Sequence, residues 1–304
     1  MSRRVLITGS FGLIGSALRV SLEERGWETV ALDLRGEGGD RGDVRNSCEV
    51  GGTIAGCCGV VHLAAVSRVV CAERDPGTCW NTNVGGVRTV LDAVGRGAPR
   101  PWLLFASSRE VYGQPDRLPA TEDCPLLPVN VYGRSKVEGE RLVQEVRDGG
   151  LRTARVRLSN VYGSTRDHAD RVVPAFVRAA VFGETIRIDG GECTFDFTHV
   201  DDTIRGIVAL IDMLETGEAP PPIHLLTGMP TTLRELASLT IALAGGKPLV
   251  VEAPSRPFDV SRFYGDPSRA RQLLGWKPRV ALREGLERLV RDTRVEAAGF
   301  GFQR

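Results

Sequence analysis

Short runs of β-branched and other apolar residues alternate with longer segments of helical periodicity in the first half of the chain. The apolar runs, predicted as strands, span residues 4–8, 29–33, 59–64, 102–107 and 154–158. The segments with apolar residues at helical spacing span residues 13–25, 83–95 and 131–146. This alternation is typical of βαβ units, whose parallel strands are covered by helices on both faces. The pattern therefore predicts an α/β fold with a doubly wound parallel sheet.

The strict alternation ends near residue 160. Helices are predicted over 173–182, 201–214, 232–244 and 282–293, and strands over 185–188 and 249–252. Three consecutive prolines within 217–224 exclude helix and mark a connection between regions. We therefore predict a larger lobe over residues 1–160, to which 193–216 return. Residues 161–192 and 217–304 form a smaller α/β lobe over the carboxyl ends of the strands, where ligands bind in such folds.

Composition excludes several classes of protein. The 304 residues carry 39 basic and 38 acidic side chains without a polybasic block, so we expect no nucleic-acid partner. No window approaches the roughly 18 uninterrupted apolar residues of a membrane span. The amino terminus runs directly into the first predicted strand, so we expect a cytoplasmic protein. The seven cysteines include no C-x-x-C pair and no histidine at ligand spacing, which predicts reduced thiols and no metal site.

The first predicted strand leads into a glycine-rich turn and then into a helix. The turn reads Gly9-Ser10-Phe11-Gly12-Leu13-Ile14-Gly15. A strand–turn–helix context is what a dinucleotide-binding glycine motif requires. Gly9 permits the tight turn, Gly12 lets the backbone approach a pyrophosphate, and Gly15 allows close helix packing. The helix amino terminus then offers unpaired N–H groups and a partial positive charge to the anion.

An acidic residue ends the second predicted strand. Asp33 stands 18 residues after Gly15, where a carboxylate can accept hydrogen bonds from ribose hydroxyls and repel a 2′-phosphate. This favours NAD over NADP as the cofactor, although Arg35 could weaken the preference. Asp43 and Val44 follow as a candidate contact for the adenine edge. The small residues of HLAA, 62–65, suit a loop beside the cofactor, and the histidine in it fits a structural role better than that of a base.

Tyr132 and Lys136 lie at i and i+4 on one face of a predicted helix. Lysine is rare in this chain, so its presence in such a pair is informative. A positive charge beside a phenol lowers the phenol's pKa from about 10, and the nicotinamide cation of bound NAD would add to this effect. Ser107 and Ser108 end a predicted strand, where the substrate should lie. The sequence therefore predicts a phenolate base usable near neutral pH.

These motifs, in this order, resemble the extended short-chain dehydrogenase/reductase family, specifically its NAD-dependent nucleotide-sugar epimerases and dehydratases. The matching segments are TGSFGLIG (8–15), Asp33, Asp43-Val44, HLAA (62–65), Asn83-Val84-Gly85, SSREVYG (107–113), YGRSK (132–136), RLSNVYG (157–163), FDFTHVDD (195–202) and RPFD (256–259). The resemblance implies a Rossmann-type sheet, NAD as cofactor, a nucleotide-diphosphate sugar as substrate, foremost a UDP-sugar, and a homodimer.

The resemblance also implies roles for individual residues. Ser108, Tyr132 and Lys136 would form the catalytic triad, and Lys136 would also hold the nicotinamide ribose. The predicted cofactor contacts are Gly9, Phe11, Gly12, Leu13, Ile14, Gly15, Asp33, Asp43, Val44, Leu63, Ala64, Ala65, Asn83, Ser107, Tyr132 and Lys136. The predicted substrate contacts are Ser108, Arg109, Tyr132, Asn160, Arg171, Arg187, Arg256 and Asp259.

One departure from the family pattern concerns the diphosphate. Family members usually carry an arginine close to the diphosphate at the position of Phe195, so this chain must bind the group differently. Arg171, Arg178 and Arg187 are candidates for the missing charge. Arg256, which resembles a diphosphate ligand of the family, has the planar guanidinium suited to bidentate phosphate binding.

The leading hypothesis is a 4-epimerase, in which oxidation at C4 gives a 4-keto sugar that is reduced again from its other face. Glu110 keeps decarboxylation of UDP-glucuronate and 4,6- or 5,6-dehydration open, because a carboxylate there could act near C5. Arg109 cannot serve as the acid of a 4,6-dehydratase, since its pKa exceeds 12, but it could pair with the C6 carboxylate of a UDP-hexuronate. A net 4-ketosugar reductase and a non-catalytic NAD-binding sensor or scaffold remain alternatives.

Overall fold

A computed structural model describes residues 3–300, so the ends of the predicted lobes at 1–2 and 301–304 lie outside the described residues. Its centre is a six-stranded parallel sheet of order β10-β5-β4-β3-β1-β2. The strands are β1 (Arg4–Thr8), β2 (Glu28–Leu32), β3 (Gly59–His62), β4 (Trp102–Ser108), β5 (Thr153–Leu158) and β10 (Ile223–Leu225). β1 pairs with both β2 and β3, and the strand order reverses there. The prediction of a doubly wound parallel sheet is confirmed.

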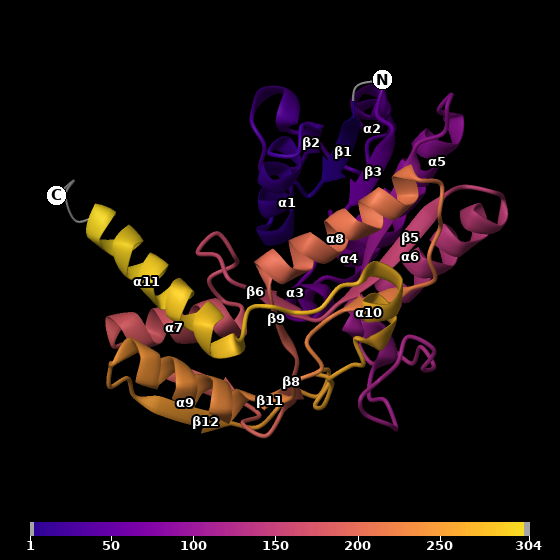
Figure 1. Cartoon of the computed structure of the whole chain (residues 1–304). Helices are drawn as coiled ribbons and strands as arrows, with labels where there is room; N and C mark the ends of the chain where they lie inside the picture. The colour runs from indigo at the N-terminus through magenta and orange to yellow at the C-terminus, as the bar shows by residue number, and fades with distance from the viewer. Residues whose placement is uncertain (1–2, 301–304) are drawn as a thin grey trace.

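Helices cover both faces of this sheet (Figure 1). One face carries α1 (Leu13–Glu23) and α8 (Val200–Glu215), which pack against each other. The other face carries α2 (Ser47–Ile54), α5 (Gly86–Arg96) and α6 (Val131–Asp148). Each face has its own hydrophobic core, because the strands alternate their buried side chains between the two helical layers.

The smaller lobe lies below the sheet in Figure 1 and has a separate core. It contains α7 (Val172–Phe182), α9 (Leu233–Ala244) and α11 (Leu282–Phe300), with the strand pairs β7 (Ile186–Asp189) with β12 (Val250–Ala253) and β8 (Thr194–Phe195) with β11 (Thr231–Thr232). β6 (Asn160–Tyr162) and β9 (Phe197–His199) form a third pair. Along the chain β6 comes directly after β5, and β9 comes directly before α8. These connections bring the smaller lobe over the carboxyl ends of the large sheet.

The predicted division of the chain is wrong in one respect. We expected residues 217–304 to lie entirely in the smaller lobe, but β10 pairs with β5 as the edge strand of the large sheet. α10 (Ser268–Leu274) packs against β10 and α8, so it also belongs to the large lobe. The proline-rich connection was interpreted as a boundary, and a three-residue strand after it is too short to show a period. The helices α3 (Val69–Arg74) and α4 (Pro76–Trp80) were also missed, because they too are too short to show a helical period.

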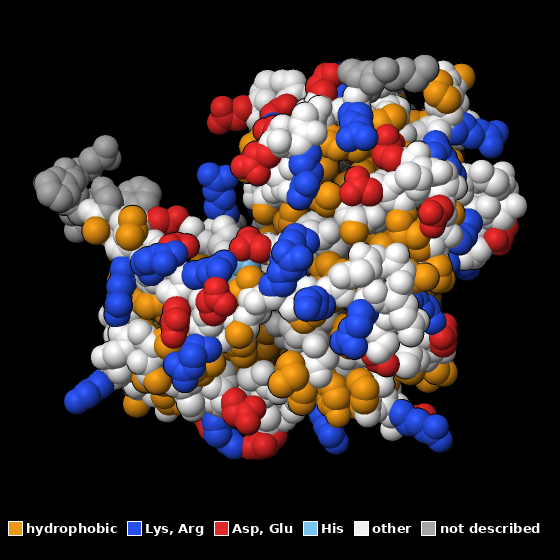
Figure 2. Space-filling view, in the orientation of Figure 1, with side chains coloured by type: hydrophobic (Ala, Val, Ile, Leu, Met, Phe, Trp, Pro, Cys, Tyr) orange, Lys and Arg blue, Asp and Glu red, His pale blue; other side chains and the backbone are white. Residues whose placement is uncertain are grey.

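Charged side chains of both signs are interspersed over the face of the molecule in Figure 2. Within residues 3–300, no helix has the length and apolar character needed to cross a membrane.

Candidate active site

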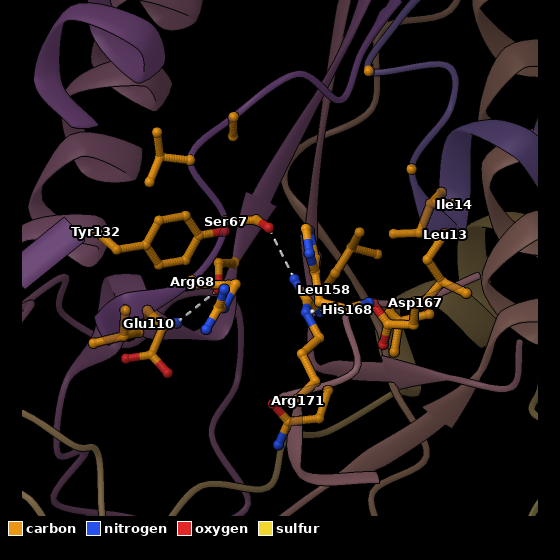
Figure 3. A pocket seen from close by; sticks show the side chains of 18 of the residues that line it. Leu13, Ile14, Ser67, Arg68, Glu110, Tyr132, Leu158, Asp167, His168 and Arg171 are labelled. Atoms are coloured by element: carbon orange, nitrogen blue, oxygen red, sulfur yellow. Dashed lines mark hydrogen bonds and ion pairs between the residues drawn. The ribbon is translucent and has the colours of Figure 1, made fainter. Parts of the chain in front are cut away.

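A cavity of about 740 Å³ is lined by residues of both lobes. The large lobe contributes the glycine turn, the loops after β2 and β3, the end of β4 and one face of α6. The smaller lobe contributes the segment around the start of α7 together with residues near β7 and β8. Figure 3 shows Tyr132 and Arg171 reaching into this space from opposite sides. The cavity therefore lies at the carboxyl ends of the strands, as predicted from the βαβ pattern.

The glycine turn has the close packing that its sequence predicts. Gly9 adopts a φ of +70°, and a Cβ there would lie 2.8 Å from the backbone nitrogen of Ala64. A Cβ on Gly15 would lie 2.2 Å from the carbonyl oxygen of Gly9. Gly12 is the N-cap of α1 and provides no capping side chain, so the first N–H groups of the helix are available for a ligand. Gly12, Leu13 and Ile14 line the cavity, which gives this end of it the features of an anion site.

Asp33 lies beside the glycine turn at the end of β2. Its carboxylate accepts hydrogen bonds of 2.9 Å from the backbone N–H groups of Phe11 and Arg35, and the Arg35 side chain forms an ion pair with it at 3.3 Å. Burial raises the pKa of Asp33, but the hydrogen bonds from Arg35 and Phe11 outweigh burial and hold the pKa below its usual value. Asp33 therefore lines the cavity as an ionised acceptor, and Arg35 is turned toward it. Asp43 and Val44 line the same end.

The loop after β3 passes along the cavity, and hydrogen bonds on its side away from the cavity hold it in place. Leu63, Ala64 and Ala65 line the cavity, as predicted. Asn83 does not: its side chain accepts a hydrogen bond of 2.7 Å from the Val66 N–H and donates one of 3.1 Å to the Val66 carbonyl. Asn83 is thus buried behind the loop and positions it. Phe11 does not line the cavity either, and its backbone N–H holds Asp33. The cofactor contacts expected of these two residues remain predictions.

His62 is a structural histidine in this fold, as the sequence favoured. Its Nδ1 is 2.8 Å from the Thr8 hydroxyl, and its ring stacks on Phe105. Burial, with a smaller contribution from Lys136, lowers the pKa of His62 to about 3. A fully buried neutral imidazole that does not line the cavity cannot act there as a base.

Tyr132 and Lys136 lie on one face of α6 and both line the cavity. Lys136 Nζ donates a hydrogen bond of 2.8 Å to the carbonyl of Ala106, at the end of β4, and lies 5.8 Å from the centre of the Tyr132 ring. Burial lowers the pKa of Lys136 to about 8. Burial raises the pKa of Tyr132 to about 12, while the charge of Arg171 and a hydrogen bond with Ser108 act in the opposite direction.

This result corrects one expectation. We predicted that the lysine would bring the phenol pKa below 10, but the burial of the phenol outweighs the cationic groups that the chain itself supplies. A further positive charge next to Tyr132 is required before it becomes a base near neutral pH. The positively charged ring of an oxidised nicotinamide is such a group, and the cavity has the anion site and the ribose acceptor that would hold it.

The end of β4 brings the other predicted catalytic residues into the cavity. Ser108 accepts a hydrogen bond of 3.2 Å from the backbone N–H of Glu110, which leaves its hydroxyl free to donate. The Glu110 carboxylate accepts 2.7 Å from Asn130 Nδ2 and 2.8 Å from Arg109 Nη2. Asn130 is also the N-cap of α6 and accepts from the Gly133 N–H at 2.7 Å. Both carboxylate oxygens of Glu110 are therefore bound by donors of the protein.

The predicted substrate contacts of the smaller lobe all line the cavity. They are Asn160 of β6, Arg171 before α7, Arg187 of β7, and the pair Arg256 and Asp259. Arg256 Nε and the Asp259 carboxylate form an ion pair at 2.8 Å. Arg178 is different, because it faces away from the cavity, stacks on Phe182 and pairs with Glu184 at 3.7 Å. Arg178 is therefore not one of the residues that replace the arginine absent at position 195.

A group of polar residues that no sequence motif predicts meets across the cavity. Ser67 accepts a hydrogen bond of 2.9 Å from Arg171, and Arg68 forms an ion pair with Asp170. Asp167 and Arg171 form a further ion pair at 3.5 Å. These residues lie in loops without periodicity, so no pattern in the sequence places them opposite each other.

Known proteins are similar to this chain in sequence over most of its length. A model of the NAD dependent epimerase/dehydratase family matches residues 5–225. A UDP-glucose 4-epimerase of Mycolicibacterium smegmatis is 32% identical, with 94% of this chain and 97% of that protein covered. A dTDP-glucose 4,6-dehydratase of Streptomyces griseus is also 32% identical, with 94% and 92% covered.

Solved structures include a near match in fold. The protein MoeE5, in complex with UDP-glucose and NAD, superimposes with a TM-score of 0.90 at 30% identity, over 97% of this chain and 99% of that one. The same protein has been solved with UDP-glucuronic acid and NAD, and that structure gives a TM-score of 0.88, with 96% of this chain and 99% of that one covered. The likeness in fold therefore extends over both lobes.

Proposed function

The chain belongs to the NAD-dependent epimerase/dehydratase family, and from this premise we propose that it is an NAD-dependent 4-epimerase of a UDP-hexose or UDP-hexuronate. The similarity to UDP-glucose 4-epimerases over nearly the full chain supports the reaction. The ionised Asp33 beside the glycine turn supports NAD as the cofactor, because a carboxylate there would repel the 2′-phosphate of NADP.

Each of the three residues Tyr132, Ser108 and Lys136 has its own role in the proposed reaction. Bound NAD would supply a hydride acceptor and a positive charge next to Tyr132. Tyr132 takes the proton from the sugar O4, and Ser108 donates a hydrogen bond to the same oxygen. Lys136, held at the Ala106 carbonyl, keeps a cation near the phenolate and is placed to hold a ribose hydroxyl. After the 4-keto sugar has rotated within the cavity, C4 would take back the hydride on its other face and Tyr132 would return the proton to O4, so no additional acid or base is consumed.

The state of Glu110 is the single observation that favours epimerisation over dehydration. Glu110 has a structural role that the chain itself accounts for, because its carboxylate is held by Asn130 and Arg109. The residue before it is an arginine, which cannot protonate a departing O6. An epimerase needs neither a base at C5 nor an acid at O6, and the remaining residues of the site are sufficient for it.

Product analysis tests this proposal. The protein would be incubated with NAD and, in separate reactions, UDP-glucose and UDP-glucuronate, and the products identified by NMR. We expect the C4 epimer in at least one reaction, without net NADH. Released CO2 would indicate a decarboxylase, a 4-keto-6-deoxy sugar a dehydratase, and tight NAD binding without turnover a sensor. The homodimer and the cytoplasmic location remain predictions, and light scattering after size exclusion would test the former.

A further inference from the structure

A carboxylate is buried one turn beyond Lys136 on α6. Glu140 and Lys136 stand at i and i+4 on one face of the helix, and they are 3% and 4% exposed. The Glu140 carboxylate accepts hydrogen bonds of 2.8 and 2.7 Å from Nε and Nη2 of Arg157, and a further one from the Ser107 hydroxyl. Ser107 and Lys136 line the cavity but Glu140 does not, so its carboxylate is fixed behind the cavity wall.

Lys136 needs a counter-charge because its ammonium group is buried. Its Nζ donates one hydrogen bond of 2.8 Å, to the Ala106 carbonyl, and lies 5.0 Å from the centre of the Phe105 ring. A buried ammonium with so little polar contact loses its proton more easily than one in water. Burial lowers the pKa of Lys136 to about 8, and the charge of Glu140 acts in the opposite direction.

The other titratable groups that face Lys136 carry no charge near neutral pH. His62 of β3 is neutral because burial lowers its pKa to about 3. Cys79 of α4 is a neutral thiol because burial raises its pKa, and burial likewise keeps Tyr132 neutral until a further cation is bound. Charged side chains on the other elements that pack against α6 have partners other than Lys136, and they include Glu73 of α3, Arg88 of α5, Arg109 and Glu110 of the turn after β4, and Arg155 and Arg157 of β5.

The spacing along α6 gives Glu140 unequal effects on Lys136 and Tyr132. A helix rises about 1.5 Å per residue, so along its axis Glu140 lies about 6 Å from Lys136 and about 12 Å from Tyr132. The positive charge that must lie next to Tyr132 to lower the pKa of the phenol also lowers the pKa of Lys136. A carboxylate one turn from the lysine and two turns from the phenol opposes the loss of the lysine's proton more than it opposes ionisation of the phenol.

We propose that Glu140 is a positioning residue of the reaction, whose charge keeps the ammonium of Lys136 ionised beside the Tyr132 phenolate. This inference rests on the proposed function, which requires a cation at Lys136. Arg157 and Ser107 hold the carboxylate in place, so its charge stays one turn from the lysine. Glu140 lies outside the cavity and therefore acts only through Lys136.

The chain contains only three lysines, so the ionisation of Lys136 can be measured without turnover. In protein labelled with [ε-13C]lysine and saturated with NAD, the signals come from Lys136, Lys247 and Lys277, and the variants K247R and K277R assign them. The chemical shift as a function of pH gives the pKa of each. We expect the pKa of Lys136 to be at least about one unit lower in E140Q than in the wild-type protein, because a neutral amide does not stabilise the ammonium.

E138Q is the matched control for this titration. It makes the same substitution on the same helix, but Glu138 lies outside the cavity and pairs with Arg141 at 2.8 Å. It should leave the pKa of Lys136 unchanged. If the unpaired Arg157 prevents E140Q from folding, E140Q/R157M removes both buried charges, and it should lower the pKa of Lys136 in the same direction.

The pH dependence of turnover gives a second measurement. A shift of the Lys136 pKa from about 8 to about 7 lowers the protonated fraction about fivefold at pH 8 and hardly changes it at pH 6. The kcat of E140Q should therefore fall about fivefold relative to E138Q at pH 8 and stay nearly equal to it at pH 6. A loss of packing would instead lower both rates by the same factor.

Two results would overturn the inference. One is an equal pKa of Lys136 in E140Q and E138Q, and the other is a loss of turnover in E140Q that is the same at pH 6 and pH 8. Absence of turnover in the wild-type protein would instead contradict the proposed function, and the NMR titration would still decide on Glu140.

Discussion

Arg171 donates a hydrogen bond of 2.9 Å to the hydroxyl of Ser67, and this contact joins the two lobes across the cavity (Figure 3). Arg68 and Asp170, which are next to Ser67 and Arg171 in the sequence, form an ion pair that also joins the two lobes. Only the first of these contacts bears on the chemistry, because the charge of Arg171 lowers the pKa of Tyr132 while burial raises it. The position of the smaller lobe is thus coupled to the reactivity of a residue on the larger one.

Substituting Arg171 with methionine should shift the pH dependence of the reaction. Removing this charge raises the pKa of Tyr132, so the acidic limb of the kcat/KM profile should move to higher pH, by about one unit if the charge is partly screened. Rates at fixed substrate over pH 6 to pH 10 would show the shift. R68M is the matched control, because it breaks the neighbouring contact between the lobes without removing a charge that acts on Tyr132. An identical shift in R68M would assign the effect to lobe movement.

Tyr132→Phe should abolish most of the turnover. The phenol is the proposed acid and base at O4, and general acid–base catalysis typically contributes about 10²- to 10⁴-fold. Product formation by NMR and NAD binding by fluorescence would show lost catalysis with retained cofactor affinity. The control is Tyr112→Phe. That buried hydroxyl lies 2.6 Å from both Arg157 and His224 outside the cavity, so its loss should cost about 1–3 kcal/mol of stability and little activity.

Glu110→Gln separates epimerisation from dehydration. The amide keeps an acceptor for Asn130 but replaces the oxygen that pairs with Arg109 by a donor; because neither contact takes part in epimerisation, an epimerase should retain its kcat on UDP-glucose within about fivefold. A dehydratase that uses Glu110 at C5 should lose about 10²- to 10⁴-fold. The measurement is the rate of epimer and of 4-keto product with the same substrate. A loss of about 10²- to 10⁴-fold would show that Glu110 takes part directly in the reaction.

The sequence predicted the elements of this site better than the relations between them. The glycine turn, Asp33, Tyr132 and Lys136 were found because a strand–turn–helix order and an i, i+4 spacing fix their geometry locally. The raised pKa of Tyr132 was not predicted, because the burial of its phenol depends on how the rest of the chain packs around it. The contact of Arg171 with Ser67 joins loops 104 residues apart and leaves no local signal. β10 was missed because three residues cannot display a period.

Asp33 should decide which dinucleotide binds. In D33A the ribose hydroxyls lose an ionised acceptor, so the Kd for NAD should rise by about 10- to 100-fold. The same change removes the repulsion of a 2′-phosphate and releases Arg35 from its ion pair, so NADP should bind more tightly than to the wild-type protein. Calorimetric titration with both cofactors measures the two changes. Asp40→Asn, an exposed acid of the same loop outside the cavity, should change neither Kd.

His62 should make the protein sensitive to acid. Its pKa is about 3 in the folded chain and about 6.5 when unfolded. The unfolded state therefore binds a proton that the folded state excludes, and the stability contributed by neutral His62 is complete above pH 6.5 and is lost progressively as the pH falls toward 3.

The glutamine variant H62Q keeps a polar partner for Thr8 but does not titrate, which makes it the reference for this effect. The difference in unfolding free energy between wild type and H62Q should shrink by about 2 kcal/mol between pH 7 and pH 5, as follows from the linkage of proton binding to unfolding. Urea titrations at both pH values, with equal m-values as the test of two-state behaviour, would measure it. A difference that stays constant with pH would mean that the folded protein accepts the proton, and that His62 is not held neutral by its burial.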